Sequence, residues 1–322
     1  MSLNTNASAF EILSTDFVKT YMRDLFAVDT FGIVSFCTYQ ASFASLLNLL
    51  RIGRRRDIIY GVNFSGEMFS SGMVSERETI TDDGRKVKYF AYDTGKRAPV
   101  WVILPGGAYA TCCIVAEGIP IAAKLAEHGI NSIIVKYSTG KNACGLQPLQ
   151  DVYAAMRDAQ KLEHFDFSHC TVCGFSAGGH LAGLASEKEN CEKAGITMPE
   201  LAVLCYPVIS FGEHAHTMSR KLFLGNRQSD SGQRKLFSLE NRAEFERSPV
   251  FMYHCKDDDI VPVENSRLFA DALKKAGKSC YYREYERGGH GLGLGIGTPE
   301  EGWLSDAIHA ASDLAYQYKL SG

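Results

Sequence analysis

The fold of this chain is decided by residues 171–182, TVCGFSAGGHLA. A short apolar run rich in β-branched residues passes into the pattern G-x-S-x-G around Ser176, and a helix-like run follows. Side chains at Gly174 and Gly178 would clash with backbone in so tight a strand-to-helix turn. The turn exposes the serine at a helix N-terminus, where developing negative charge is favoured. We therefore predict a nucleophile elbow, and the alternative is a serine that only caps a helix.

Outward from this segment, short apolar runs alternate with helical patterns from residue 79 to the end of the chain. Strands are predicted at 100–104, 132–137, 171–175, 201–206, 250–255 and 279–285. Helices are predicted at about 118–128, 148–164, 177–189, 263–276 and 300–319. Residues 79–81 and 87–92 flank an Asp-Asp-Gly turn and predict an antiparallel hairpin. The alternation predicts an α/β fold with a mostly parallel central sheet flanked by helices.

Two segments break this alternation and define the predicted domain organisation. Residues 1–75 show helical pieces and loop, and we predict an N-terminal helical extension that serves as a lid or cap. Residues 76–322 form the predicted catalytic domain. Within it, residues 211–249 are polar and irregular, which predicts an excursion between two strands. Loops at this edge of a sheet often contribute to a substrate pocket.

A serine hydroxyl is a weak nucleophile, so a base and an acid are expected later in the chain, in the order Ser, Asp, His. His290 lies in a Gly-Gly-His-Gly loop after the last predicted strand, from which an imidazole can reach the elbow. The alternative is a surface histidine in a glycine turn. The acid is expected just after strand 250–255, where Asp257, Asp258 and Asp259 follow one another. Position alone leaves the choice among these three open.

A tetrahedral intermediate needs backbone donors from an earlier loop at the same edge of the sheet. Residues 104–109, LPGGAY, lie where the HGGG-type loop of esterases is expected. We predict that the amides of Gly107, Ala108 and Ala177 form the oxyanion hole. A glycine turn without a catalytic part is the alternative.

These motifs together resemble one family. The segments that carry the resemblance are GFSAGGHLA at 174–182, PGG at 105–107, YPVI at 206–209, DDIVPVENS at 258–266 and GGHGL at 288–292. They are similar to the acetyl xylan esterase-like branch of the α/β-hydrolase superfamily, near the esterase/lipase and feruloyl-esterase-like families. The resemblance covers residues 79–319. It implies an α/β-hydrolase fold and hydrolysis of short acyl esters without metal or cofactor, with acetyl groups on sugars as one candidate substrate.

The resemblance also chooses among the three aspartates. Family members place the acid four residues before the proline of a D-x-x-V-P pattern, which here is Asp258 before Pro262. Ala108 stands where a glycine is usual, and Cys112-Cys113 stand where the loop commonly carries a serine. These departures leave the substrate open and do not change the expected reaction type.

Charge and cysteine content exclude some classes of partner. The 34 basic and 37 acidic side chains nearly balance, so we expect no nucleic acid or polyanion as partner. The ten cysteines are scattered, several of them in apolar runs, and we expect free thiols. Cys170-x-x-Cys173 has redox or zinc spacing, but it lies inside an apolar run and is interpreted as two buried thiols. His214-x-His216 is interpreted as loop polarity rather than as a metal site.

The beginning of the chain bears on its location. Residues 1–10 lack the basic and apolar regions of a secretory signal, so the expected compartment is the cytoplasm. Residues 30–50 carry no charged side chain and run into a cluster of arginines, as a membrane span does. They also contain Gln40, Asn48 and many serines and threonines, and we expect a helix packed on the catalytic domain. Association with a membrane surface and a true membrane span are the two alternatives.

The predicted function is that of a serine carboxylesterase with Ser176 as nucleophile, His290 as base and Asp258 as the acid that orients it. The partner is then a small ester, and the sequence selects no oligomeric state. One rival is a serine peptidase of the prolyl-oligopeptidase-like group, which shares the fold but usually carries a large additional domain. The other is a binding protein that keeps the scaffold without turnover.

Overall fold

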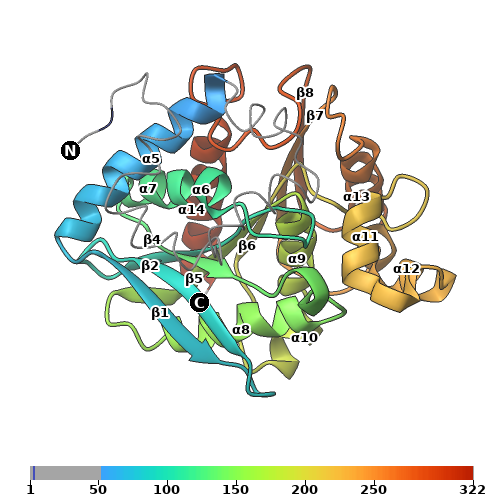
Figure 1. Ribbon diagram of the computed structural model, residues 1–322, viewed down its shortest axis with the longest axis horizontal. Coiled ribbons are helices and arrows are strands. Elements are labelled where there is room, and N and C mark those ends of the chain that lie inside the picture. The colour runs from blue at the N-terminus through green and yellow to red at the C-terminus, as the bar shows by residue number, and fades with distance from the viewer. Residues whose placement is uncertain (1–2, 4–51, 322) are drawn as a thin grey trace, which may run out of the picture.

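The computed structural model describes residue 3 and residues 52–321. These residues contain an eight-stranded sheet in the order β1-β2-β4-β3-β5-β6-β7-β8 (Figure 1). The strands are β1 (Val74–Ile80), β2 (Lys86–Tyr92), β3 (Ala98–Leu104), β4 (Asn131–Lys136), β5 (Phe165–Phe175), β6 (Leu201–Cys205), β7 (Val250–Cys255) and β8 (Cys280–Tyr285). β1 and β2 form the predicted antiparallel hairpin, β2 pairs antiparallel with β4, and all other pairs are parallel. The prediction of a mostly parallel sheet is confirmed.

Helices cover both faces of this sheet, which explains why its central strands are continuous apolar runs. The helices before and between the later strands are α5 (Ile52–Ser70), α6 (Ile114–Glu117), α7 (Ile119–Glu127), α8 (Gln147–Ala159), α9 (Ala177–Ala185), α10 (Lys188–Lys193), α13 (Glu264–Lys275) and α14 (Trp303–Ser321). One core cluster contains apolar side chains of α8, α9 and α13, and the other contains those of α5, α6, α7 and α14. The two clusters therefore lie on opposite faces.

The Cys170-x-x-Cys173 motif lies on β5, where neighbouring side chains alternate between the faces. Cys170 belongs to one core cluster and Cys173 to the other. Both are buried and free. A spacing of three residues on a strand directs the two thiols away from each other, so this pair does not form the close dithiol that a redox motif requires.

The excursion between β6 and β7 is more regular than its sequence indicated. It contains α11 (Thr217–Leu224), η2 (Gly225–Arg227), α12 (Ser231–Phe237) and η3 (Leu239–Arg242). Asp230 caps α12 by accepting hydrogen bonds from the amides of Gly232 and Gln233. Phe223 lies in the core and contacts Phe211 and Phe237, with ring centroids 5.7 and 5.1 Å away. The mostly polar composition of this segment gave no clear signal for its few buried apolar side chains.

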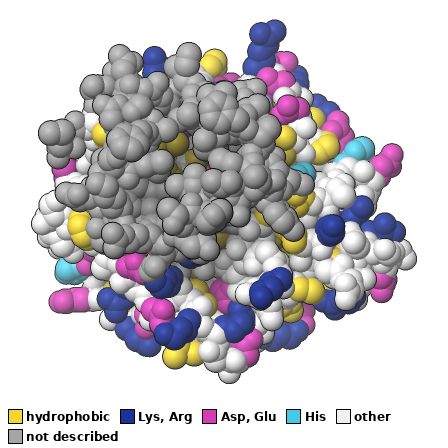
Figure 2. Space-filling view, viewed as in Figure 1, with side chains coloured by type: hydrophobic (Ala, Val, Ile, Leu, Met, Phe, Trp, Pro, Cys, Tyr) yellow, Lys and Arg dark blue, Asp and Glu magenta, His cyan; other side chains and the backbone are white. Residues whose placement is uncertain are grey.

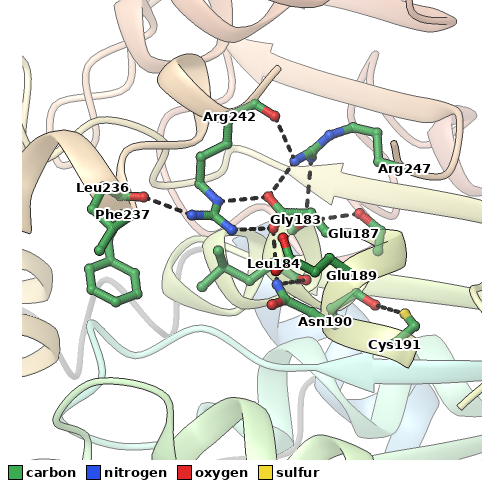
Figure 3. Close-up of polar contacts among 12 residues, drawn as sticks. Gly183, Leu184, Glu187, Glu189, Asn190, Cys191, Leu236, Phe237, Arg242 and Arg247 are labelled. Atoms are coloured by element: carbon green, nitrogen blue, oxygen red, sulfur yellow. Dashed lines mark hydrogen bonds and ion pairs between the residues drawn. The ribbon is translucent and has the colours of Figure 1, made fainter. Parts of the chain in front are cut away.

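A buried ion cluster ties the excursion to the end of α9 (Figure 3). The Glu187 carboxylate accepts hydrogen bonds from Arg242 Nη2 and Arg247 Nη2, both at 2.5 Å. Glu187 is 1% exposed, and the side chain of Arg247 is fully buried. Removing one partner of such a cluster leaves an uncompensated buried charge. The cluster therefore fixes residues 242–247 against the helix that begins at the serine elbow.

The first described helix, α5, packs against α7 and α6. α5 lies along one side of the molecule beside α6 and α7, away from α11 and α12 (Figure 1). A Cβ at Gly61 would lie 2.7 Å from Pro120 Cα, so glycine permits the close crossing of α5 and α7. The sheet begins at Val74. Residues 30–50 lie outside the described residues, and none of the described helices is long and apolar enough to cross a membrane.

The described surface carries interspersed charges. On the face in Figure 2, Lys and Arg side chains alternate with Asp and Glu side chains among the coloured atoms. Exposed ion pairs on the described surface include Lys86 with Glu78 and Lys188 with Glu246. The balance of charge in the sequence is thus also a local balance on this face.

Candidate active site

The elbow lies at the end of β5, where Ser176 connects the strand to α9. Ser176 has φ 53° and ψ −116°, a conformation that L-residues rarely adopt. A Cβ at Gly174 would collide with the Gly178 carbonyl, and one at Gly178 would collide with the Leu104 carbonyl. Both glycines of G-x-S-x-G are therefore required by close backbone approach, as predicted.

The structure brings together the three side chains selected from the sequence. His290 Nε2 lies 2.9 Å from Ser176 Oγ, and His290 Nδ1 lies 2.7 Å from Asp258 Oδ2. The carboxylate accepts the Nδ1 hydrogen, so Nε2 is left to accept the serine hydroxyl hydrogen. The elbow, the loop after β7 and the loop after β8 supply one residue each.

Asp258 is held as a carboxylate by donors on both oxygens. Oδ1 accepts hydrogen bonds from the amides of Ile260 and Val261, both at 2.9 Å, and Oδ2 also accepts from His254 Nε2 at 3.0 Å. Burial alone would raise the pKa of Asp258, but the hydrogen bonds from His254 and His290 outweigh it and hold the pKa well below its usual range. The carboxylate is thus available to His290 over the whole neutral range.

His254 was not selected from the sequence. It is fully buried at the end of β7, and its Nε2 lies 3.0 Å from both Asp258 Oδ2 and the Val261 carbonyl. Both neighbours are acceptors, so Nε2 carries the hydrogen, and Nδ1 accepts from Ser266 Oγ at 2.7 Å. The sequence signal that could have identified His254 is its position four residues before the chosen aspartate.

The two neighbouring aspartates are exposed and point elsewhere. Asp257 Oδ1 accepts a hydrogen bond from the Gly289 amide at 2.8 Å, so it supports the loop that carries the histidine. Asp259 is exposed at the turn that follows. Of the three carboxylates, Asp258 is the one in contact with His290.

Several residues near Ser176 have a strained backbone conformation. Among the described residues, the non-glycine residues with positive φ are Ala108 (58°), Tyr109 (61°), Ser176 (53°) and Tyr206 (37°). Gly107 has φ 126°. No acceptor in the described part of the chain takes the amide hydrogens of Gly107, Ala108 or Ala177. Strained backbone with unused donors beside a serine is typical of a site built for a ligand or transition state.

A buried carboxylate, which the sequence analysis did not select, supports the 105–109 loop. Glu117 accepts hydrogen bonds from the Gly106 amide at 2.7 Å and from the Tyr206 hydroxyl at 2.9 Å. The Tyr206 ring lies against His290, with centroids 4.9 Å apart, and its oxygen accepts from the Gly293 amide at 3.2 Å. Glu117 is the one charged residue between Arg97 and Lys124, and that isolation was its sequence signal.

His180 joins the same loop to the excursion. Its Nε2 lies 2.7 Å from the Phe237 carbonyl and therefore carries the hydrogen, so Nδ1 accepts from the Tyr109 hydroxyl at 2.8 Å. The ring is fully buried. Burial lowers the pKa of His180 to about 4.

This shift predicts acid sensitivity of the fold. The pKa of His180 is about 4 in the folded protein and returns to its ordinary value of 6.5 when the chain unfolds. As pH falls, the unfolded chain therefore takes up this proton before the folded protein does. Stability from this residue is complete above pH 6.5 and is lost as pH falls towards 4, by about 3 kcal/mol at ~1.4 kcal/mol per pKa unit. Urea denaturation at several pH values measures it.

The matched comparison is His180→Gln, which keeps a donor for the Phe237 carbonyl but does not titrate. Other buried groups titrate in the same pH range, because burial lowers the pKa of His216 to about 4 and raises that of Asp57 to about 6. The difference between the two proteins isolates His180. An equal loss of stability in both would contradict the assignment.

His214 and His216 lie just before α11, with His216 at its N-cap position. No group of three or more His, Cys, Asp or Glu side chains within the described residues is arranged to hold a metal ion. His216 Nδ1 instead contacts Ser219 Oγ at 2.8 Å at the start of α11. Burial, with a smaller effect of His290, lowers the pKa of His216 to about 4.

Comparison with known proteins gives the site a context. The prolyl oligopeptidase family model matches residues 136–302, just over half of the chain. Endo-1,4-beta-xylanase B of Butyrivibrio fibrisolvens is 32% identical over 215 residues, 63% of this chain and 34% of that protein. Acetylxylan esterase of Xylanibacter ruminicola is 30% identical over 224 residues, 67% of this chain and 45% of that protein.

A solved structure extends the likeness to three dimensions. The acetyl ester-xyloside bifunctional hydrolase from Caldicellulosiruptor lactoaceticus is similar with a TM-score of 0.62 and 32% identity, covering 71% of this chain and 89% of that one. The predicted α/β-hydrolase fold and the resemblance to acetyl xylan esterase-like proteins are confirmed. The two curated relatives are longer, and the chain spans 34% and 45% of their lengths.

Proposed function

Because the chain belongs to the prolyl oligopeptidase family of α/β-hydrolases, we propose that it is a serine hydrolase that cleaves carboxylic esters. The observation that carries the proposal is the continuous contact from Ser176 Oγ through His290 to Asp258, at 2.9 and 2.7 Å. This is the geometry of a nucleophile, its base and an orienting carboxylate.

The reaction proceeds in two displacements. His290 takes the proton of Ser176 as Oγ attacks the ester carbonyl, and Asp258 stabilises the imidazolium that forms. The amides of Gly107, Ala108 and Ala177 donate to the tetrahedral oxyanion. His290 then protonates the leaving alcohol, and water attacks the acyl-enzyme by the same route in reverse. None of these steps requires a group from outside the chain other than ester and water.

Short acyl groups, with acetylated carbohydrate as the alcohol part, are the proposed substrate class. Two similar proteins have names that refer to acetyl esters, and the third is named a xylanase. Peptide hydrolysis is the second candidate, because the matched family is described as one of oligopeptidases.

A panel of substrates tests this function. We expect kcat/KM to be highest on p-nitrophenyl acetate and butyrate, lower on the decanoate, and at least about 100-fold lower on aminoacyl p-nitroanilides. We also expect the protein to release acetate from acetylated xylo-oligosaccharides, the proposed natural class of substrate. Higher kcat/KM on the decanoate than on the acetate would refute the short-acyl assignment, and faster anilide cleavage would favour the peptidase.

A further inference from the structure

The loop that carries His290 has little conformational preference of its own. It connects β8 to α14 and contains positive-φ glycines at 288, 289, 291, 293, 295 and 297. Glycine loses more backbone entropy on ordering than any other residue, so such a loop adopts one conformation only when contacts impose it. The position of His290 over Ser176 therefore depends on side chains that hold the loop.

Three of these contacts come from the catalytic domain. Asp257 accepts from the Gly289 amide at 2.8 Å, Tyr206 accepts from the Gly293 amide at 3.2 Å, and Trp303 Nε1 donates to the Gly293 carbonyl at 2.9 Å. All three lie within the segment that matches the family model or next to its end. They hold the part of the loop from residue 289 to residue 293.

The next part of the loop is held by a residue far away in the sequence. Asp57 on α5 accepts hydrogen bonds from the Gly295 amide at 3.0 Å through Oδ2 and from the Ile296 amide at 2.9 Å through Oδ1. A Cβ at Gly293 would lie 2.9 Å from Asp57 Oδ2, so the loop backbone is pressed against the carboxylate. Asp57 lies well before residue 136, where the family match begins.

The surroundings of Asp57 are costly for a carboxylate. It is 1% exposed, and its neighbours Ile58 and Ile59 share a core cluster with Leu292 and Leu294. Burial raises the pKa of Asp57 to about 6, and the backbone hydrogen bonds oppose this rise only in part. The carboxylate is thus kept buried at a cost, and its two oxygens are the acceptors for two backbone amides of the histidine loop.

We propose that Asp57 is a positioning residue for catalysis, a carboxylate that α5 supplies to hold the histidine loop with His290 over Ser176. The proposal rests on the proposed function. Asp57 acts through the loop backbone, because its two oxygens bond to amides five and six residues beyond His290. Without it, His290 is in line with the serine in a smaller fraction of molecules, and the rate falls with that fraction.

Two variants test the proposal. Asp57→Ala removes both acceptors, and we expect kcat on p-nitrophenyl acetate to fall about tenfold or more with KM within twofold. Asp57→Asn keeps one acceptor oxygen, so kcat is expected between those of wild type and Asp57→Ala. The rate of covalent labelling of Ser176 by a fluorophosphonate should fall by the same factors, because it reports activation of the serine without turnover.

The matched control is Glu67→Gln, which removes an acidic charge from an exposed position on the same helix. It should leave kcat, KM and labelling unchanged. Each variant is assayed at a temperature well below the midpoint of its own thermal unfolding. If Asp57 had only a structural role, Asp57→Ala would lower the midpoint of thermal unfolding and leave kcat unchanged. Full kcat in folded Asp57→Ala overturns the proposal; if Asp57→Ala does not fold, full kcat in Asp57→Asn does so. A wild-type protein without esterase activity or labelling would instead refute the proposed function.

Discussion

Replacement of Ser176 with alanine is expected to lower kcat on short acyl esters by about 10⁶-fold, the size of effect found when a serine hydrolase loses its nucleophile. That corresponds to about 8 kcal/mol of transition-state stabilisation. The substitution removes Oγ, the atom that lies 2.9 Å from His290 Nε2, and with it the covalent pathway. Alanine keeps the Cβ, so the strained backbone at φ 53° is no worse than in the wild-type protein.

Ester hydrolysis and fluorophosphonate labelling measure this result together. Both should disappear in Ser176→Ala, while Ser168→Ala, at an exposed position on the same strand, should retain both. If Ser176→Ala keeps more than about one hundredth of the wild-type kcat, Ser176 is not the nucleophile. If the folded wild-type protein neither labels nor turns over esters, the scaffold serves binding rather than catalysis.

The second large effect is expected at Asp258. In a serine triad an Asp-to-Asn change lowers kcat about 10⁴-fold, because the amide stabilises the wrong imidazole tautomer and not the imidazolium. The amide group in Asp258→Asn would also meet the His254 Nε2 hydrogen and two backbone amides, all of which need an acceptor. We therefore expect Asp258→Asn to be nearly inactive, with a loss of about 5 kcal/mol of transition-state stabilisation at ~1.4 kcal/mol per decade.

The adjacent aspartates provide the controls. Asp257→Asn keeps an acceptor for the Gly289 amide, and Asp259 is exposed, so both amide variants should retain kcat/KM within about tenfold. All three proteins are compared by circular dichroism before kinetics. An inactive Asp257→Asn or Asp259→Asn beside an active Asp258→Asn would move the assignment by one position along the chain.

Local sequence predicted the fold class, Ser176 and His290 of the proposed triad, and three adjacent candidates for its acid. An apolar strand before GFSAG, a Gly-Gly-His-Gly loop after the last strand and an aspartate after β7 are local patterns, and the strand order of an α/β sheet brings their ends to one edge. The choice of Asp258 among three neighbours came from a family resemblance. In the structure, Asp258 Oδ2 lies 2.7 Å from His290 Nδ1.

The tertiary structure alone decided which polar side chains support the site. Asp57 meets Ile296 across 239 positions of sequence, Glu117 meets Tyr206 across 89, and His180 meets Tyr109 across 71. A buried polar group must find its partner wherever the packed chain places one, and no local pattern records that distance. The alternation of strands and helices therefore specified where the reacting groups lie, whereas the side chains that hold them in place follow from long-range packing.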